Sequence, residues 1–309
     1  MLSDDVRARL EKLNRTSLPD QAPHSVESEV QGVESELGSP PKGQRVNTPW
    51  GPHWLIQQPL QQLWPQGPEL IAGTLATETP SIQGEHDELD RLQHAFPHHT
   101  ILLDLETCGF AGSIIFLAGV MHPQNGELVL SQLWARDYSE EKALLHSLWT
   151  LVHRAQLLIT FNGKSFDWPQ VQDRSTLHHL GQKIDGLAPS HSPPGYPGSP
   201  LEPIYLSPNS NRPIIPHFDL LHHARRRWKS QLPNCKLQTL ERYICGRKRV
   251  DDIPGRDIPQ AYHDYVRTGR DHQTKSILHH NALDLVTLLQ LSLTFIGQQL
   301  QAVSSRAAS

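Results

Sequence analysis

The sequence is poor in cysteine and has no long apolar run. Its three cysteines, Cys108, Cys235 and Cys245, are too few and too irregularly spaced for a disulfide framework or a zinc ligand set. The longest apolar run, near residues 114–121, is well short of the roughly 20 residues that a membrane-spanning helix needs. A basic, apolar signal segment is also missing from the N-terminus. We therefore expect a soluble, cytoplasmic chain with inert thiols and no membrane contact.

Strong net charge is absent as well. The formal charge is −4 over 309 residues, which argues against a surface that binds polyanions everywhere. The charge is nevertheless uneven: residues 1–99 hold 7 Lys and Arg against 14 Asp and Glu, whereas residues 217–270 hold 12 against 6. A phosphate-binding face is expected in the second segment, with Arg225, Arg226 and Lys229 as candidates, although a merely solvated helix face is the alternative.

Composition divides the chain into an arm and a main domain. Residues 1–95 are rich in Pro, Gln, Glu and Ser, which predicts a partly flexible arm. The tryptophans of residues 50–64 are costly to leave in water, so this segment is expected to pack on the main domain of residues 96–300. Within that domain, residues 181–213 contain eight prolines among many Gly and Ser, which predicts an extended surface insertion.

The main domain has the pattern of an α/β fold. Three β-type runs come first, then a helix that Ser139 is expected to cap, and then a buried strand that ends at Asn162-Gly163. Another strand and four helices follow the insertion. This order predicts a mixed central sheet flanked by helices. The expected strands are residues 101–105, 113–121, 128–135, 157–161 and 214–219, and the expected later helices are residues 220–231, 237–245, 259–268 and 271–299.

Two acids lie on the first of these strands. Asp104 and Glu106 are two residues apart, so their side chains leave the same face of the sheet and could share one metal ion. The pair alone fits a structural role as caps of the turn at Gly109 equally well.

Further polar candidates come from a loop and from the last helix. Asp167 follows a strand and a glycine turn, where functional groups are common, although turn formers and helix caps are common there too. His280 and Asp284 are four residues apart on an apolar helix face, whereas His279 should point elsewhere. An acid on a buried stripe needs a partner, and a lone buried His is usually a core residue.

Four carboxylates and one histidine together favour metal-dependent hydrolysis. Mg²⁺ and Mn²⁺ take oxygen ligands, and two such ions about 4 Å apart can stabilise the attacking and leaving oxygens at a phosphodiester. We therefore expect two Mg²⁺ or Mn²⁺ ions, with His280 available to orient or deprotonate water.

The motifs resemble those of the DEDD exonucleases of the ribonuclease-H-like superfamily, most closely its YprB-like family. The resemblance covers roughly residues 96–295 and rests on three motifs: Asp104-Leu105-Glu106-Thr107, Asn162-Gly163-Lys164-Ser165-Phe166-Asp167, and His280-Asn281 with Asp284. The middle stretches His217-Phe218-Asp219-Leu220-Leu221 and Asp252-Ile253-Pro254-Gly255 are similar as well.

The resemblance implies a ribonuclease-H-like fold and a role for each motif residue. Asp104, Glu106, Asp167 and Asp284 would be metal ligands and His280 the general base. Proofreading-type relatives with this spacing carry Tyr in place of the histidine. Beside the acids, Thr107, Asn162 and Lys164 are assigned to nucleic-acid contact.

The expected function is a metal-dependent 3′→5′ exonuclease acting on ends of single-stranded DNA or RNA, without an obligate protein partner. Two alternatives stay open. One is a nucleic-acid-binding module that has lost catalysis, against which the complete acid set argues. The other is an endonuclease of the same fold that cuts branched DNA internally.

Overall fold

The structure is a computed structural model, and it describes residues 43–76, 88–110, 112–180, 215–250, 252–271 and 273–307. The expected N-terminal helix start and the rest of residues 1–42 lie outside this range, as does the expected insertion at residues 181–213. Everything described belongs to one compact unit, Pro40–Ser309.

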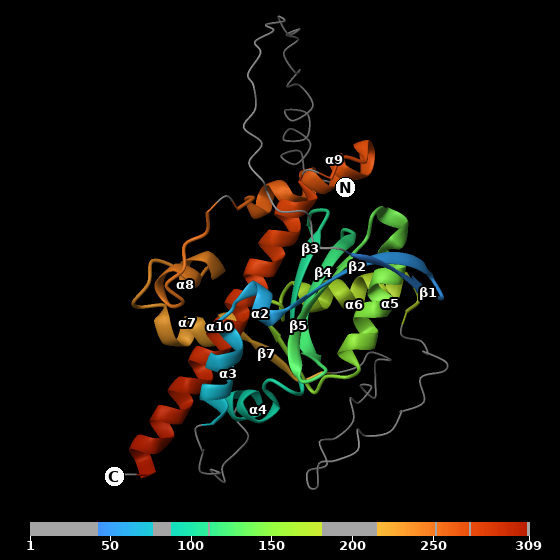
Figure 1. Cartoon of the computed structure of the whole chain (residues 1–309). Helices are drawn as coiled ribbons and strands as arrows, with labels where there is room; N and C mark the ends of the chain where they lie inside the picture. The colour runs from blue at the N-terminus through green and yellow to red at the C-terminus, as the bar shows by residue number, and fades with distance from the viewer. Residues whose placement is uncertain are drawn as a thin grey trace, which may run out of the picture. The chain divides into compact units, whose positions relative to one another are not determined.

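A mixed seven-stranded sheet forms the centre of this unit (Figure 1). The strand order is β1-β2-β5-β4-β3-β6-β7. Within this order, each pair of neighbouring strands in β1-β2-β5-β4-β3 is antiparallel. The pairs β3-β6 and β6-β7 are parallel. The expected α/β class, with helices flanking a mixed sheet, is confirmed. The strands are β1 (Gln44–Thr48), β2 (Gly51–Pro59), β3 (Thr100–Thr107), β4 (Ile115–Gln124), β5 (Glu127–Trp134), β6 (Leu157–Thr160) and β7 (His217–Asp219).

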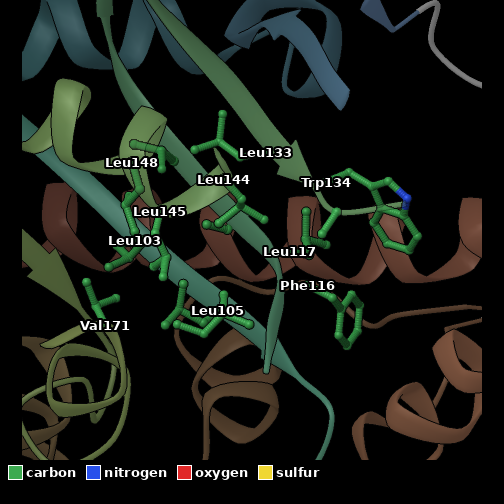
Figure 2. Close-up of a cluster of buried hydrophobic side chains, with 14 of the residues drawn as sticks. Leu103, Leu105, Phe116, Leu117, Leu133, Trp134, Leu144, Leu145, Leu148 and Val171 are labelled. Atoms are coloured by element: carbon green, nitrogen blue, oxygen red, sulfur yellow. The ribbon is translucent and has the colours of Figure 1, made fainter. Parts of the chain in front are cut away.

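Helices cover both faces of the sheet. One face packs against α5 (Glu141–Val152), α6 (Asp167–Leu177) and α9 (Ile258–Thr268); Figure 2 shows the leucines of α5 meeting those of β3, β4 and β5. The opposite face packs against α10 (Thr274–Ala307) and the shorter helices around it. These are α2 (Leu60–Leu63), α3 (Gly67–Leu75), α4 (Glu88–Ala95), α7 (Leu220–Trp228) and α8 (Leu237–Tyr243). Two 3₁₀ turns complete the set, η1 (Tyr138–Glu140) and η2 (Gly255–Asp257).

The sheet begins earlier than the expected domain start at residue 96. β2 pairs with β5, and Ile56 is 3% exposed because it packs in the same core as the leucines of α5. The expectation that the tryptophan-containing segment packs on the main domain therefore fits the position of β2, which lies within the sheet.

The side-chain cap before the helix after β5 lies two residues earlier than the sequence suggested, and it caps a 3₁₀ turn that precedes the helix. Ser139 is not the cap: the carboxylate of Asp137 accepts a hydrogen bond from the Ser139 backbone N–H at 2.8 Å. The 3₁₀ turn η1 follows, and α5 starts at Glu141. Both residues are good caps, so local preference could not separate them.

The alternation of β3 prepares the functional site. Leu103 and Leu105 point into the core beneath α5. Asp104 lies between these two leucines and Glu106 follows Leu105. Both acid side chains therefore point to the opposite face of the sheet, where α10 contacts β3. In the part of the chain described here, none of the helices is both long and apolar enough to span a bilayer.

Candidate functional site

Two acids of the site come from β3. Asp104 and Glu106 are partly buried on the face that α10 covers. Asn281 of α10 donates a hydrogen bond from Nδ2 to Oδ2 of Asp104 at 2.8 Å. This contact fixes the side of the sheet on which the acids lie.

Asp167 reaches β3 from the neighbouring strand connection. β6 pairs with β3 only as far as Leu102, so the later residues of β3 extend past the end of this pairing. The carboxylate of Asp167 accepts backbone hydrogen bonds at Leu105 and at its own N–H. Asp167 is 6% exposed and begins α6. It therefore stands beside the strand residue that separates Asp104 from Glu106.

The turn before Asp167 is held by another acid. Asp219, which is fully buried, accepts hydrogen bonds from the backbone N–H groups of Asn162 at 2.9 Å and Lys164 at 3.1 Å. The same carboxylate caps α7 through the N–H of Leu221. Asn162 has a φ of +64°, a left-handed conformation that Asn tolerates better than most residues. Asp219 thus sets the path of the chain into Asp167.

His280 and Asp284 complete the group from α10. His280 is 7% exposed, and its Nε2 lies 3.3 Å from Oδ2 of Asp284. His279 is exposed. The helix thus turns His280 and Asp284 inward and His279 outward, as the four-residue spacing indicated.

The acids influence one another strongly. Burial and the charges of Asp284 and Glu106 raise the pKa of Asp104 well above its usual range. Burial and the charges of Asp284 and Asp167 do the same to the pKa of Glu106. Burial, together with nearby Asp219 and Asp284, raises the pKa of Asp167 to about 7. These carboxylates therefore lie close enough to repel one another, and the nearby cations do not cancel the repulsion at Asp104, Glu106 and Asp167.

Asp284 differs from the other three acids because two cations contact it. Burial alone would raise its pKa, but the hydrogen bond from His280 and the charge of Arg249 outweigh that effect and lower it. Burial alone would lower the pKa of His280, but Asp284 and Asp252 outweigh that effect and raise the pKa of the imidazole to about 9. The Arg249 guanidinium forms a very short ion pair with Asp284.

Asp252 and Arg249 are site residues to which the sequence analysis gave no role in the site, although Asp252 begins one of the stretches that resemble the family. Asp252 accepts from Nδ1 of His280 at 2.9 and 3.0 Å. Arg249 donates to Asp252 at 3.1 Å and to Glu241 at 2.6 Å. The available signal for Asp252 was an acidic pair directly before Ile253-Pro254, and nothing local tied that pair to a helix about 30 residues away.

The donor set suits a hard divalent cation in its chemistry. Carboxylate oxygens are the ligands that Mg²⁺ and Mn²⁺ prefer, and uncompensated negative charge is what such an ion neutralises. Among the described residues, however, no three His, Cys, Asp or Glu side chains already surround one point as a ligand shell. Arg249 and Asn281 instead hold Asp284 and Asp104 by hydrogen bonds.

The expected nucleic-acid contacts lie in two groups. Thr107 is beside the acids, but its hydroxyl donates to the carbonyl of Gly109 at 2.9 Å. Arg225 and Arg226 line a pocket of about 520 Å³ with His222 and Glu88.

Lys164 is connected to the pocket residues of α7 through Glu88. Its Nζ donates to Glu88 at 2.9 Å, and Glu88 also binds His223 at 2.9 Å. Lys229 is exposed just after α7. The turn that carries Asn162 and Lys164 therefore connects the acids to the arginines of α7.

Two arginines of the basic segment do not belong to an open phosphate-binding face. Arg247 and Arg249 both turn inward to Glu241, which is 1% exposed. A buried carboxylate needs a cation, and the sequence could not indicate which of the neighbouring basic residues would supply it.

Three comparisons with known proteins each found a match. The family model of the RNase_H superfamily matches residues 101–295. The uncharacterized protein YprB of Bacillus subtilis (strain 168) is 31% identical over 197 residues, which are 63% of this chain and 41% of that protein. The present chain thus spans less than half of this relative.

Among solved structures, the family B DNA polymerase from the hyperthermophilic archaeon Pyrobaculum calidifontis aligns with a TM-score of 0.45 and 14% identity. The alignment covers 63% of this chain and 24% of the polymerase. The family match, by contrast, spans more than half of the chain and takes in all four acids together with His280. The chain therefore belongs to the RNase H superfamily, and its identity to YprB supports the resemblance to the YprB-like ribonuclease-H-like family within it.

Proposed function

We propose that the chain is a metal-dependent nuclease that hydrolyses phosphodiester bonds at the ends of single-stranded nucleic acid in the 3′→5′ direction. One observation carries this proposal: the buried, mutually repelling carboxylates of β3 and α6 meet Asp284 of α10, while the cations Arg249 and His280 contact Asp284. Membership of the RNase H superfamily supports it.

Asp104, Glu106, Asp167 and Asp284 would hold two Mg²⁺ or Mn²⁺ ions. Bound there, the ions would supply Lewis acidity to the phosphate and lower the pKa of water. Asp284 would share its charge between metal and the residues that already contact it. Asn281 and Asp219 keep Asp104 and the Asp167 turn in place.

His280 would take the proton of the attacking water in its neutral form, which cations bound at the carboxylates would favour by offsetting the negative charge of Asp284 and Asp252 that raises the pKa of His280 to about 9. Its Nδ1 is engaged by Asp252, so Nε2, which faces Asp284, is the nitrogen available for transfer. The water oxygen would bond to phosphorus, the bond between phosphorus and the 3′ oxygen would break, and the leaving 3′ oxygen would take a proton from solvent. In this reaction Asp252 orients His280 as a carboxylate orients many catalytic imidazoles.

The substrate strand would run from the acids past Lys164 to α7. Exposed Phe166 and Phe110, which are 38% and 94% exposed, stand in the turns beside Asp167 and after β3. Aromatic faces stack on bases without regard to sequence, and the arginines of α7 would contact phosphates.

The test is an assay of 5′-labelled and 3′-labelled single strands with Mn²⁺. We expect stepwise loss of nucleotides from the 3′ end, abolished in Asp104→Asn and reduced about 10²–10⁴-fold in His280→Ala. His279→Ala is the matched control, because its side chain is exposed on the same helix turn.

Two results would contradict the proposal. Cleavage only inside branched duplexes would favour the endonuclease alternative. Tight strand binding with no Mn²⁺-dependent turnover in the wild-type chain would favour a binding module that has lost catalysis.

A further inference from the structure

A chain of buried amides crosses the core from β5 to Asp104. Gln132 of β5 is 2% exposed, and Asn281 of α10 is fully buried. Gln132 donates from Nε2 to the Leu278 carbonyl at 2.7 Å and to Oδ1 of Asn281 at 3.0 Å. Asn281 in turn donates from Nδ2 to the Asp104 carboxylate at 2.8 Å and to the Asp104 carbonyl at 3.2 Å.

The donor and the acceptor of each hydrogen bond in this series are fixed. The carbonyl of Leu278 can only accept, so the amide of Gln132 must place Nε2 towards it. That nitrogen then also faces Asn281 and requires an acceptor there, which is Oδ1. Nδ2 of Asn281 is therefore left facing Asp104, which can only accept when ionised.

The backbone makes room for this arrangement at one position. A Cβ atom on Gly119 of β4 would lie 2.0 Å from Oδ1 of Asn281 and 2.7 Å from a methyl group of Leu285. Any other residue at position 119 would displace the Asn281 amide. Glycine is needed here for space between a strand and a helix, since its backbone conformation is not in the left-handed region.

We propose that Gln132, Asn281 and Gly119 form a positioning relay, in which Gln132 sets the orientation of the Asn281 amide and Asn281 holds the Asp104 carboxylate for metal binding. This inference rests on the proposed function, because it assigns Asp104 to a divalent cation. Hydrogen bonds to a ligating carboxylate fix its rotamer before the metal arrives.

The relay differs from the rest of the core in what its loss would change. A buried amide that served only packing would alter stability when removed. A relay that orients a ligand would alter metal affinity as well, and replacing Gln132 would do so without touching Asp104.

Mn²⁺ titration of the full chain, with free Mn²⁺ followed by electron paramagnetic resonance, tests the relay. We expect Asn281→Ala and Asn281→Asp to weaken Mn²⁺ binding about 10–100-fold. Gln132→Leu should weaken it in the same direction, and the double variant should be no weaker than Asn281→Ala alone, since both changes break one chain.

Ser292→Ala is the matched control. Ser292 is fully buried on the same helix, and its hydroxyl donates to the Leu288 carbonyl at 2.8 Å, away from Asp104. It should lose stability in thermal unfolding while keeping the wild-type affinity for Mn²⁺. If Asn281→Ala does not fold, Gln132→Leu carries the same test one step further from the ligand.

The outcomes separate the relay from the proposed function. Wild-type Mn²⁺ affinity in folded Asn281→Ala or Gln132→Leu, with affinity lost in Asp104→Asn, would overturn the relay and leave the metal site standing. A wild-type chain that binds no Mn²⁺ would overturn both.

Discussion

At the scale of single residues, Arg249 is the side chain on which most of the site's charge balance depends. It contacts Glu241, Asp252 and Asp284, and its side chain is 8% exposed. Arginine suits this position because its planar fork can bind several carboxylates at once, which a lysine ammonium cannot do with the same geometry. Removing it would leave three buried carboxylates with only Arg247 and His280 to balance them.

We expect Arg249→Met to lower the free energy of unfolding at pH 7 by about 3–5 kcal/mol, as is typical when one partner of a buried ion pair is lost. Urea unfolding measures this change. The adjacent exposed Lys248 provides the control, because Lys248→Met should change stability by less than about 0.5 kcal/mol. Equal effects of the two replacements would show that Arg249 is not the counter-ion of this cluster.

At the scale of elements, the strand-to-helix junctions do most of the positioning. β7 ends at Asp219, whose carboxylate both starts α7 and holds the turn that follows β6. On the opposite face of the sheet, Gln170 of α6 accepts from the N–H of Gly112 at 2.8 Å and so ties the turn after β3 to the helix that Asp167 begins. The site acids thus depend on connections between neighbouring elements.

β7 also carries a histidine that should make stability depend on pH. Burial lowers the pKa of His217 from 6.5 to about 4, and its Nε2 lies 2.7 Å from the Thr160 hydroxyl. Below about pH 6.5 the unfolded chain takes up a proton that the folded chain does not accept until about pH 4, so stability falls as pH falls through this window.

The loss attributable to His217 should approach roughly 3 kcal/mol by pH 4. In His217→Gln, the decline of unfolding free energy between pH 7 and pH 4 should be smaller by about that amount. An unaltered pH profile in His217→Gln would contradict the assignment.

The elements were largely predictable because their patterns are local. Alternation and apolar runs placed β3, β4, β5 and the start of α10 close to their observed bounds. The spacing of His280 and Asp284 likewise predicted a shared inward face. Asp252 could not be found in this way, because its contact with His280 is made across 28 residues of chain.

The partners of buried polar residues also could not be predicted from local sequence. Gln132 interrupts an apolar strand, which signals a partner, but only tertiary structure identifies that partner as Asn281. The inward turn of Arg247 and Arg249 had the same cause: their partner, Glu241, lies on α8 and is buried by it.

At the scale of the whole molecule, the proposed substrate path joins the acids to the basic residues of α7. Arg225, Arg226 and Lys229 are all exposed and follow one another along one end of that helix. Nucleic-acid binding through such contacts releases counterions and weakens with salt.

Replacing Arg225, Arg226 and Lys229 together with Ala should flatten the salt dependence of single-strand binding. The slope of log K against log salt should become shallower by about 2, at roughly 0.7 per lost contact. Fluorescence anisotropy with a labelled strand at several salt concentrations measures it. Arg154, exposed before β6 at the far end of the strand from Asn162, supplies the control variant Arg154→Ala. A slope that does not change would mean that these cations are only a solvated face.

The position of α10 also has a consequence for the local dynamics of the site. The same helix carries His280, Asn281 and Asp284 and buries a row of apolar side chains against the sheet from Leu285 onward. Backbone amides in this part of α10 should therefore exchange with solvent deuterium only when the whole domain unfolds. The segment between α8 and α9 brings Arg249 and Asp252. Its described residues, 244–250 and 252–257, form no strand or long helix, so their amides should exchange sooner. The site thus combines residues of α10, whose backbone amides should exchange slowly, with residues of the segment between α8 and α9, whose amides should exchange faster.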